Sequence, residues 1–486
     1  MVNLRYILWI LLLVTLVIAA MMLVPSVMAW KLGEQEALRA FLATYAAAAL
    51  FVAAALPLTR RLTSKTMRSR DGYLAVTLSW VAAAALSALP LFLSAACPDF
   101  TTAFFEAMSG LTTTSATALL DVEVLPRSIL FWRSMTNWLG GMGIVVLFVA
   151  LLPVLGQSAS LLVGAETVGP TKDKLTPKIK NTALILWSIY LGFSLVQTAL
   201  LRLGGLGLYE AVTITFSTMS TAGFSVTNTS IAGYASPYIE TVIIIFMLAS
   251  ATNFALYYKA LTGRISAVFK DGELRAFLGI WAIVTLVGSF NLLSTHTYST
   301  VAEALRYSSF QTASILTTTG FTSADYLSWP IFNQLLLFML FFVGGCSGST
   351  GSGMKVIRVA TLFKMGRAQM KSRIHPRGVF QVRVGQRTIT RDLQLSIATF
   401  FGIYILTGIV ASVIFSLSAQ ADLLTAISSA FLFLGNVGVG FGAAGPGSSF
   451  ALLEAPLKWF ASALMLVGRL ELFTVYVLFT GHFWRR

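Results

Sequence analysis

Long apolar runs separated by short polar stretches recur along the whole chain. Most of them have about 20 residues, enough for a helix to cross the ~30 Å hydrocarbon layer of a membrane. The runs are continuous rather than alternating, so they predict membrane helices and not the strands of a β-barrel. Two runs lead the chain, Tyr6–Trp30 and Phe41–Leu58. A signal peptide is the competing interpretation of the first run, but its length and the second run directly behind it favour a pair of spans.

Behind this pair, one order of elements occurs four times: an apolar span, a short helix, a loop rich in Thr, Ser and Gly, and a return span. The outward spans are Leu74–Ala96, Ala183–Leu203, Phe277–Leu293 and Leu393–Leu417. The short helices are Thr101–Leu111, Leu208–Met219, Val301–Leu316 and Leu423–Leu434, and the loops are 112–117, 220–225, 317–322 and 435–442. The return spans are Ile129–Leu155, Tyr238–Leu261, Ile331–Phe363 and Leu457–Phe483.

The predicted fold class is therefore an all-α membrane protein with ten full spans and four half-spans. Four pseudo-repeated span–pore helix–filter loop–span units surround one pore, and two transmembrane helices precede them. The expected divisions are 1–60 for the leading helices, 72–157, 181–264, 272–364 and 392–486 for the four units, and 365–391 for a basic cytoplasmic hairpin.

The four loops have the composition of a cation filter. Non-helical backbone is tolerated at membrane depth only where it is buried or lines a wet cavity, so four such loops argue for one shared axis. Glycine allows a positive φ, which lets successive carbonyls point the same way, and rings of carbonyls can replace the water around an ion. The predicted filter consists of Thr113, Thr114, Ser115, Thr221, Ala222, Gly223, Thr318, Thr319, Gly320, Asn436, Val437 and Gly438. K⁺ is expected at Thr113, Thr114, Thr221, Ala222, Thr318, Thr319, Asn436 and Val437.

Composition and charge agree with a membrane transporter. Only 11% of the residues are charged and 56% are hydrophobic, whereas soluble proteins carry about 25% charged residues. The net charge of +15 does not indicate nucleic acid, because 26 of the 34 basic residues fall at the termini and in segments between spans. That alternation follows the positive-inside rule and puts both termini in the cytoplasm. Cys97 and Cys346 form no metal or disulfide pattern, and no clustered His, Cys or carboxylate predicts an enzyme or an organic cofactor.

Five short motifs carry a resemblance to a known family. They are Leu130-Phe131-Trp132-Arg133-Ser134, Asn137-Trp138-Leu139-Gly140-Gly141-Met142-Gly143, Gly344–Gly351, Lys355-Val356-Ile357-Arg358 and Gly468–Thr474. With the four loops, they resemble the Trk/Ktr/HKT superfamily of potassium and sodium transporters, most closely its bacterial TrkH branch. The resemblance covers essentially the whole chain. It implies a homodimer with one pore per protomer, and a cytosolic nucleotide-binding regulatory ring, the TrkA-type partner, which this chain does not encode.

The third return span is interrupted by residues 344–353, called the gate segment below. The interruption is too rich in Gly and Ser for a continuous helix. The resemblance implies an intramembrane gate made of Gly344, Gly345, Cys346, Ser347, Gly348, Ser349, Thr350 and Gly351 together with Arg469. A helix contact through small residues is the alternative for the segment. For Arg469, a charge in mid-membrane, the alternative is a structural ion pair.

Other basic and acidic residues allow two interpretations each. Lys355 and Arg358 suit either positive-inside anchoring or gating. The segment Lys364–Arg391 carries eight basic residues, which suit either the cytosolic partner or anionic membrane lipid. Asp121 and Asp325 follow the first and third loops, where they either concentrate cations or are solvated turn residues.

The predicted function is potassium uptake across the bacterial inner membrane, with K⁺ as the transported ion. Three loops carry glycine at the matched position and the first carries Ser115. In plant relatives, serine at this position goes with sodium preference, so a sodium-conducting or weakly selective transporter is the first alternative. An ion-coupled solute symporter is the second, although symporters usually bind substrate at an unwound midplane site without fourfold loops. Channel-like flow and coupled symport both remain open.

Overall fold

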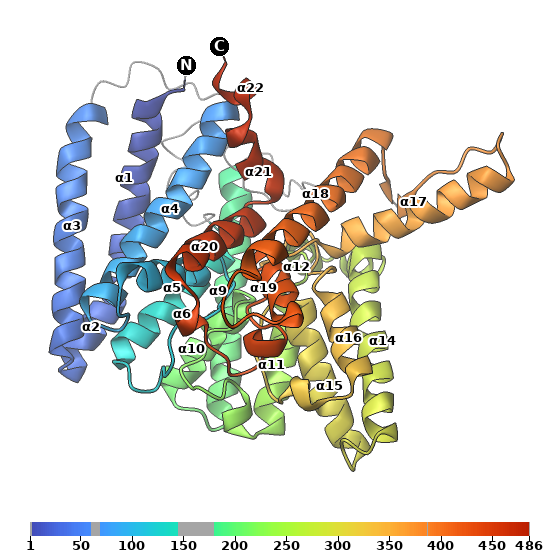
Figure 1. Cartoon of the computed structure of the whole chain (residues 1–486), viewed down its shortest axis with the longest axis horizontal. Coiled ribbons are helices and arrows are strands. Elements are labelled where there is room, and N and C mark those ends of the chain that lie inside the picture. Colours follow the sequence, from blue (N-terminus) through green and yellow to red (C-terminus); the bar gives the residue numbers. More distant parts are fainter. Residues whose placement is uncertain (1, 60–68, 144–178, 386, 486) are drawn as a thin grey trace.

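The computed structural model describes residues 2–59, 69–143, 179–385 and 387–485. The second half of the predicted return span Ile129–Leu155 lies outside these residues, as do most of the basic segments 60–70 and 172–180. In the described part, the start of α1 and the end of α22 lie on the same side of the molecule (Figure 1).

The leading run folds as a helical hairpin. The helices are α1 (Leu4–Met21), α2 (Leu23–Leu32) and α3 (Gln35–Thr59). Gly33 ends α2 with a φ of 72°, a left-handed conformation that costs glycine little. Glu34 follows in the turn, and α3 then runs back along α1. The hairpin stands at one edge of the molecule (Figure 1).

The four units follow in order, each with a long helix, a short helix that ends at a loop, and a return segment. The first contains α4 (Ser69–Leu93), α5 (Phe100–Leu111) and α6 (Arg127–Gly141). The second contains α9 (Ile179–Leu203), α10 (Leu208–Met219), α11 (Pro237–Ser250) and α12 (Phe254–Leu261), with α13 (Ile265–Phe269) behind it. The third contains α14 (Gly272–Ser294), α15 (Val301–Leu316), α16 (Ile331–Leu340) and α17 (Val356–Ile374). The fourth contains α18 (Arg391–Phe415), α19 (Leu423–Gly435), α20 (Ala455–Arg469), α21 (Leu472–Tyr476) and α22 (Gly481–Trp484).

The return segments differ from the continuous spans predicted for the second and fourth units. Between α11 and α12 the chain bends by 93°, and between α20 and α21 by 116°. The first bend has a physical cause in the gate segment, because Ala251 O accepts a hydrogen bond from the Cys346 N–H instead of continuing the helix. At the second bend, Glu471 takes a φ of 61°. The break predicted in the third unit lies between α16 and α17.

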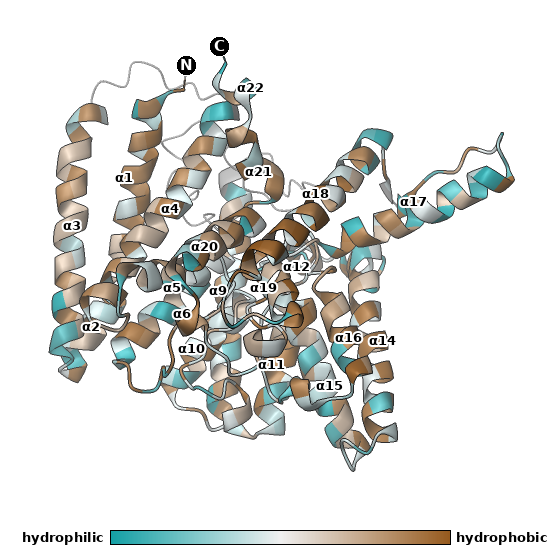
Figure 2. Cartoon of the chain, in the orientation of Figure 1, coloured by the Kyte–Doolittle hydropathy of each residue, from teal (hydrophilic) through white to brown (hydrophobic). Residues whose placement is uncertain are grey.

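Six described helices are long and apolar enough to cross a membrane, or eight if each bent pair is one span. The predicted total of ten is not reached in the described residues, because α16 is short and the end of the first return span lies outside them. Apolar residues cover long helices such as α3 and α18, whereas polar residues gather at the far end of α17 (Figure 2). The chain is thus a multi-pass membrane protein.

The basic segment 365–391 is helical in its first part. α17 continues to Ile374 and extends away from the body of the molecule (Figure 1). A two-stranded antiparallel hairpin follows, with β1 (Arg383–Val384) paired to β2 (Arg387–Thr388). A small apolar cluster of Ile357, Val382, Val384 and Ile389 fixes the hairpin against the start of α17.

Candidate functional site

The four short helices end in the same hydrogen-bonded cap. In the first loop, the Thr113 N–H donates to Gly110 O and the Thr114 N–H to Ser109 O. This is the Schellman arrangement, in which the residue after the helix adopts a left-handed conformation. The equivalent left-handed residues are Thr113, Thr221, Thr318 and Asn436, with φ between 51° and 60°. All four helices therefore direct their C-terminal carbonyls, with partial negative charge, to the start of a loop.

Left-handed threonines are strained, since β-branched residues rarely adopt a positive φ. Their hydroxyls have defined partners: the Thr113 Oγ1 accepts a bond of 3.1 Å from Arg469, and the Thr318 Oγ1 accepts one of 3.0 Å from the Ser352 N–H. Strain of about 1–3 kcal/mol at such a residue persists only where its surroundings over-determine it. Two of the four loops are thus tied directly to residues predicted for the gate or next to it.

Glycines bring successive loops into close contact. A Cβ on Gly223 would lie closer than 3.0 Å to Thr319 O of the third loop. A Cβ on Gly320 would meet Val437 O of the fourth loop in the same way, and one on Gly438 would meet Thr114 O of the first. The loops therefore follow one another in a ring, and the carbonyl next to each of these glycines belongs to a residue predicted to bind K⁺.

Each loop also accepts a hydrogen bond from the unit that precedes it in the ring. Phe450 N–H donates to Thr117 O, which joins the fourth unit to the first loop. Ile231 N–H donates to Thr322 O, and the Tyr326 hydroxyl donates to Gly440 O. Between the first and second loops, the contact comes from the Arg133 guanidinium, which donates to Ser225 O at 2.9 Å.

The Arg133 guanidinium takes part in a buried ion pair behind the first loop. Its Nε lies 2.6 Å from the Glu106 carboxylate, and both side chains are almost wholly buried. Glu106 also accepts bonds from the Thr117 hydroxyl and the Ala118 N–H, and the guanidinium stacks over the Phe224 ring at 3.5 Å. A buried ion pair is tolerable only with such additional bonds, so the pair fixes both loops.

Ser115 differs from the matched glycines as the sequence predicts, and it nevertheless has a φ of 59°. Gly320 and Gly438 also have positive φ, at 79° and 88°, whereas Gly223 does not. The Ser115 hydroxyl donates to the side-chain Oδ1 of Asn137 on α6 at 3.2 Å. The left-handed conformation costs a residue with a Cβ about 1–2 kcal/mol, so the first loop carries strain that glycine would lack.

The gate segment is held between the second unit and the loops. The Cys346 N–H donates to Ala251 O, Gly348 O accepts from the Phe254 N–H, and the Thr350 hydroxyl donates to Ser250 O. The segment also contacts α14, where the Glu273 carboxylate accepts a hydrogen bond of 2.7 Å from the Ser347 N–H. The predicted gate residues thus lie together, next to the bend between α11 and α12.

Arg469 ends α20 with its guanidinium buried under the loops. Its bonds go to Thr113 Oγ1, Thr350 O, Ser352 Oγ, Gly140 O and Gly141 O, at 2.5–3.2 Å. These oxygens come from the first loop, the gate segment and the end of α6. A fixed positive charge therefore joins the three elements.

The two basic residues after the gate segment are not free surface anchors. Lys355 is fully buried, and its ammonium donates to Gly351 O within the segment. Arg358 donates to the Glu471 carboxylate at 2.6 Å and stacks on Phe400 at 3.9 Å. The buried contacts of both side chains therefore differ from those of exposed membrane anchors.

The acidic residues after the loops lie at turns. Asp121 accepts hydrogen bonds from the Asn228 side chain and the Glu123 N–H, which lower the pKa of its carboxyl group and keep it ionised. Asp325 caps a short turn by accepting from the Leu327 N–H. Both side chains therefore have turn-forming contacts.

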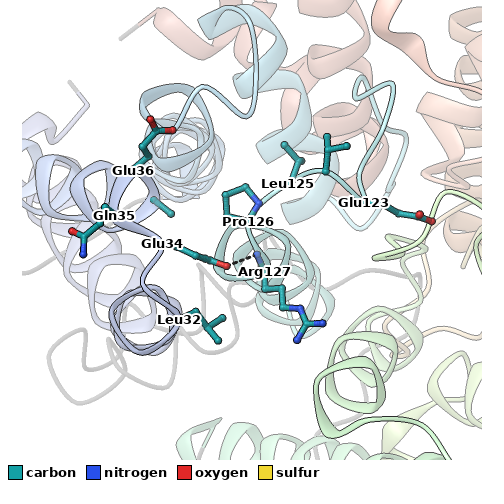
Figure 3. A pocket seen from close by; sticks show the side chains of 10 residues that line it. Leu32, Glu34, Gln35, Glu36, Glu123, Leu125, Pro126 and Arg127 are labelled. Carbon is teal, nitrogen blue, oxygen red and sulfur yellow. Dashed lines mark hydrogen bonds between the residues drawn. The ribbon is translucent and has the colours of Figure 1, made fainter.

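A wide pocket of about 580 Å³ lies apart from the loops, between the turn before α3 and the start of α6. Figure 3 shows the Glu34 carboxylate reaching the Arg127 N–H, and the same carboxylate also accepts from the Ser128 N–H at 3.0 Å. An acidic group at a helix N-terminus satisfies donors that have no partner in the helix. Glu34 thus anchors the helix that carries Arg133 and Asn137.

The Glu34→Ala variant should lower the free energy of unfolding by about 1–2 kcal/mol, the usual contribution of a helix cap. Thermal unfolding of the purified protein in detergent measures this loss. Glu36→Ala is the matched control, because Glu36 is exposed in the same pocket on α3. Equal melting temperatures for the two variants would contradict the capping role.

Sequence reasoning gave no role to Glu106, Asn137, Glu273 or Asn253. Glu106, Asn137 and Glu273 are buried polar side chains, and Asn253 caps the start of α12. The signal that could have found Glu106 and Arg133 is their charge within apolar segments, where an ionisable group needs a partner. Asn137 lies in a motif that was used only for the family resemblance.

Comparisons with known proteins identify the family of the chain. The family model described as "TrkH: Cation transport protein" matches residues 37–486. The chain is 38% identical over 477 residues to "Trk system potassium uptake protein TrkH" of Escherichia coli strain K12, covering 97% of this chain and 98% of that protein. It is 36% identical over 422 residues to TrkG of the same strain, covering 86% of each. "Crystal Structure of the Potassium Transporter TrkH from Vibrio parahaemolyticus" matches with a TM-score of 0.87 and 34% identity, over 99% of this chain and 100% of that one.

The matches extend over nearly the full length of the chain and of its relatives. They confirm the all-α membrane fold class and the resemblance found in the sequence motifs. The family is one of transport proteins, so the prediction that the chain is not an enzyme is also confirmed. The chain belongs to the TrkH family of cation transport proteins.

Proposed function

We propose that this protein takes up potassium ions through a filter formed by its four loops. The observation that carries the proposal is the ring of contacts in which Gly223, Gly320 and Gly438 each lie against a carbonyl of the next loop. Loops in such a ring can surround one ion with backbone oxygens. The C-terminal ends of α5, α10, α15 and α19 add partial negative charge around the same axis. The relatives named above are described as potassium uptake proteins, which agrees with K⁺ as the transported ion.

The gate segment and Arg469 close the path below the filter in this proposal. The supporting contacts are the bonds from Arg469 to Thr113 and Thr350, and the bond from the Ser352 N–H to Thr318. A buried guanidinium repels a cation in a site from which water is excluded. Opening then requires the segment to withdraw from the loops.

We place the protein in the bacterial inner membrane with both termini in the cytoplasm, as charge distribution favours. The membrane potential supplies ~2.3 kcal/mol per 100 mV for a monovalent cation, so uptake needs no ATPase in this chain. The relatives are named as parts of a Trk system, which supports a partner from such a system. In this proposal the protein is a homodimer, and its partner is a cytosolic nucleotide-binding ring that regulates it. The projecting α17 and its hairpin are the surface for that ring, and anionic lipid is the alternative ligand of their basic residues.

Ion flux into liposomes that contain the purified protein tests the function. Potassium uptake driven by a membrane potential alone is expected, with sodium carried more slowly. Equal sodium flux would favour the weakly selective alternative. Uptake that requires a proton or sodium gradient, or that carries an organic solute, would contradict channel-like potassium flow.

Ser115→Gly should raise the K⁺/Na⁺ flux ratio. Glycine adopts the observed φ of 59° without the ~1–2 kcal/mol cost of a Cβ, so the carbonyls of the first loop can hold their positions more closely. An energy difference of this size corresponds to a gain of up to about 5- to 30-fold in the ratio. An unchanged ratio in the liposome assay would remove Ser115 as a determinant of selectivity.

A further inference from the structure

One face of α6 lies between the first and second loops. Arg133, Asn137 and Gly141 are spaced four residues apart, so they share this face. Arg133 donates to Ser225 O of the second loop. A Cβ on Gly141 would lie closer than 3.0 Å to Ser220, the first residue of the second loop. Asn137 is between them and is fully buried.

The Asn137 side chain connects the two loops through a chain of hydrogen bonds. Its Oδ1 accepts from the Ser115 hydroxyl at 3.2 Å, and its Nδ2 donates to the Ser217 Oγ at 3.1 Å. The Ser217 hydroxyl in turn donates to Phe224 O at 2.7 Å, the carbonyl directly after Gly223. Each hydroxyl has one proton, and the Ser217 proton is used on Phe224 O. Ser217 can therefore only accept from Asn137, which fixes the orientation of the amide.

These hydrogen bonds lie at the junction between the first and second loops, where a serine stands in place of the glycine found at the other three junctions. The other three junctions place Gly223, Gly320 and Gly438 against a carbonyl of the next loop. At the first junction the matched residue is Ser115, which has a Cβ and a strained φ. A bond to its hydroxyl can hold it in that conformation, as partners outside the loops do for Thr113 and Thr318.

We propose that Asn137 is a positioning residue for ion selectivity, which acts by holding Ser115 and the cap of the second loop in one register. The inference rests on the proposed function, since it assumes that the loops select the ion. Asn137 does not contact the ion itself. It compensates for the serine in the first loop, so its effect on selectivity depends on the presence of the Ser115 hydroxyl.

A double-mutant cycle on the full-length protein in liposomes tests this dependence. Asn137→Ala should lower the K⁺/Na⁺ flux ratio by about two- to tenfold, the factor that corresponds to one net hydrogen bond. Ser115→Ala, which removes only the hydroxyl, should lower the ratio by a similar factor. In the Ser115→Gly background, Asn137→Ala should change the ratio by less than about 1.5-fold, since coupling is lost with the partner.

Asn333→Ala is the matched control. Asn333 is also a buried asparagine, but its amide donates to Gly288 O on α14 and to no loop of the ring. It should reduce stability without changing the ratio. The proposal is overturned if Asn137→Ala leaves the wild-type ratio unchanged, if it acts equally in both backgrounds, or if Asn333→Ala shifts the ratio as much.

If Asn137→Ala does not fold, the Ser115→Ala variant still tests the proposal. It removes the same hydrogen bond at Ser115, which is only partly buried. An unchanged ratio in Ser115→Ala would also overturn the proposal. Failure of the proposed function is distinguishable, because the wild-type protein would then carry no potassium at all.

Discussion

Arg469→Gln is expected to raise potassium flux about 100-fold in the absence of any cytosolic partner. Its guanidinium lies under the first loop and against Thr350 of the gate segment. For an ion that passes ~6 Å from this charge at an effective dielectric constant of about 20, the repulsion is ~3 kcal/mol. Removing a barrier of that size speeds passage by about two orders of magnitude. The measurement is potassium uptake by liposomes that contain only the variant.

Arg469→Lys separates the charge from the hydrogen bonds. An ammonium keeps the positive charge but cannot reach several oxygens at once as a planar guanidinium does. Flux in the lysine variant should stay near that of the wild type, while its thermal stability falls together with that of Arg469→Gln. A lysine variant as leaky as the glutamine variant would show that the bonds to Gly140, Thr350 and Ser352 close the path, and not the charge.

The short helices could be predicted almost to the residue. Leu208–Met219 and Val301–Leu316 have the predicted bounds, and the other two differ by one residue at one end. Their apolar periodicity is strong, and the Thr/Gly stretches that end them form local caps within six residues. Local signals of this kind need no knowledge of the rest of the fold.

The broken return segments could not be predicted in the second and fourth units. No Gly or Pro marks the bend between α11 and α12, where the sequence is Ala249-Ser250-Ala251-Thr252-Asn253. The bend is stabilised by Cys346 and Gly348, which lie about a hundred residues further along the chain. The gate segment itself was visible because its glycines oppose a helix, but its partners in α11 and α12 were not.

The candidate site shows the same division between local and distant information. The loop residues follow from four similar stretches, whereas the contacts between loops depend on how the units close into a ring. Glu106 and Arg133 are 27 residues apart, and Arg133 reaches Ser225 a further 92 residues on. Such pairs can be suspected from buried charge, but the choice of partner requires the structure.

Gly438→Ala should remove most of the preference for potassium over sodium. A Cβ at this position would meet Thr114 O, and the φ of 88° is unfavourable for alanine. The fourth loop must shift to relieve the contact. Its carbonyl oxygens then move by roughly a few tenths of an ångström and no longer replace the hydration shell of potassium as closely. We expect the K⁺/Na⁺ flux ratio to fall at least about tenfold, in addition to a stability loss of ~1–2 kcal/mol from the backbone.

Two further glycines separate the effects of contact and backbone strain. Gly205 has a φ of 94° and open space around its Cβ position, so Gly205→Ala should reduce stability by ~1–2 kcal/mol and leave the flux ratio unchanged. Gly223 has no positive φ, but a Cβ at this position would meet Thr319 O. Gly223→Ala should therefore reduce the K⁺/Na⁺ flux ratio with little backbone strain. If Gly205→Ala alters selectivity as much as Gly438→Ala does, the close packing of the loops does not set selectivity. Backbone strain would then act on selectivity through the overall stability of the protein. A large loss of selectivity in Gly223→Ala and Gly438→Ala alone would identify the contact between neighbouring loops as the determinant.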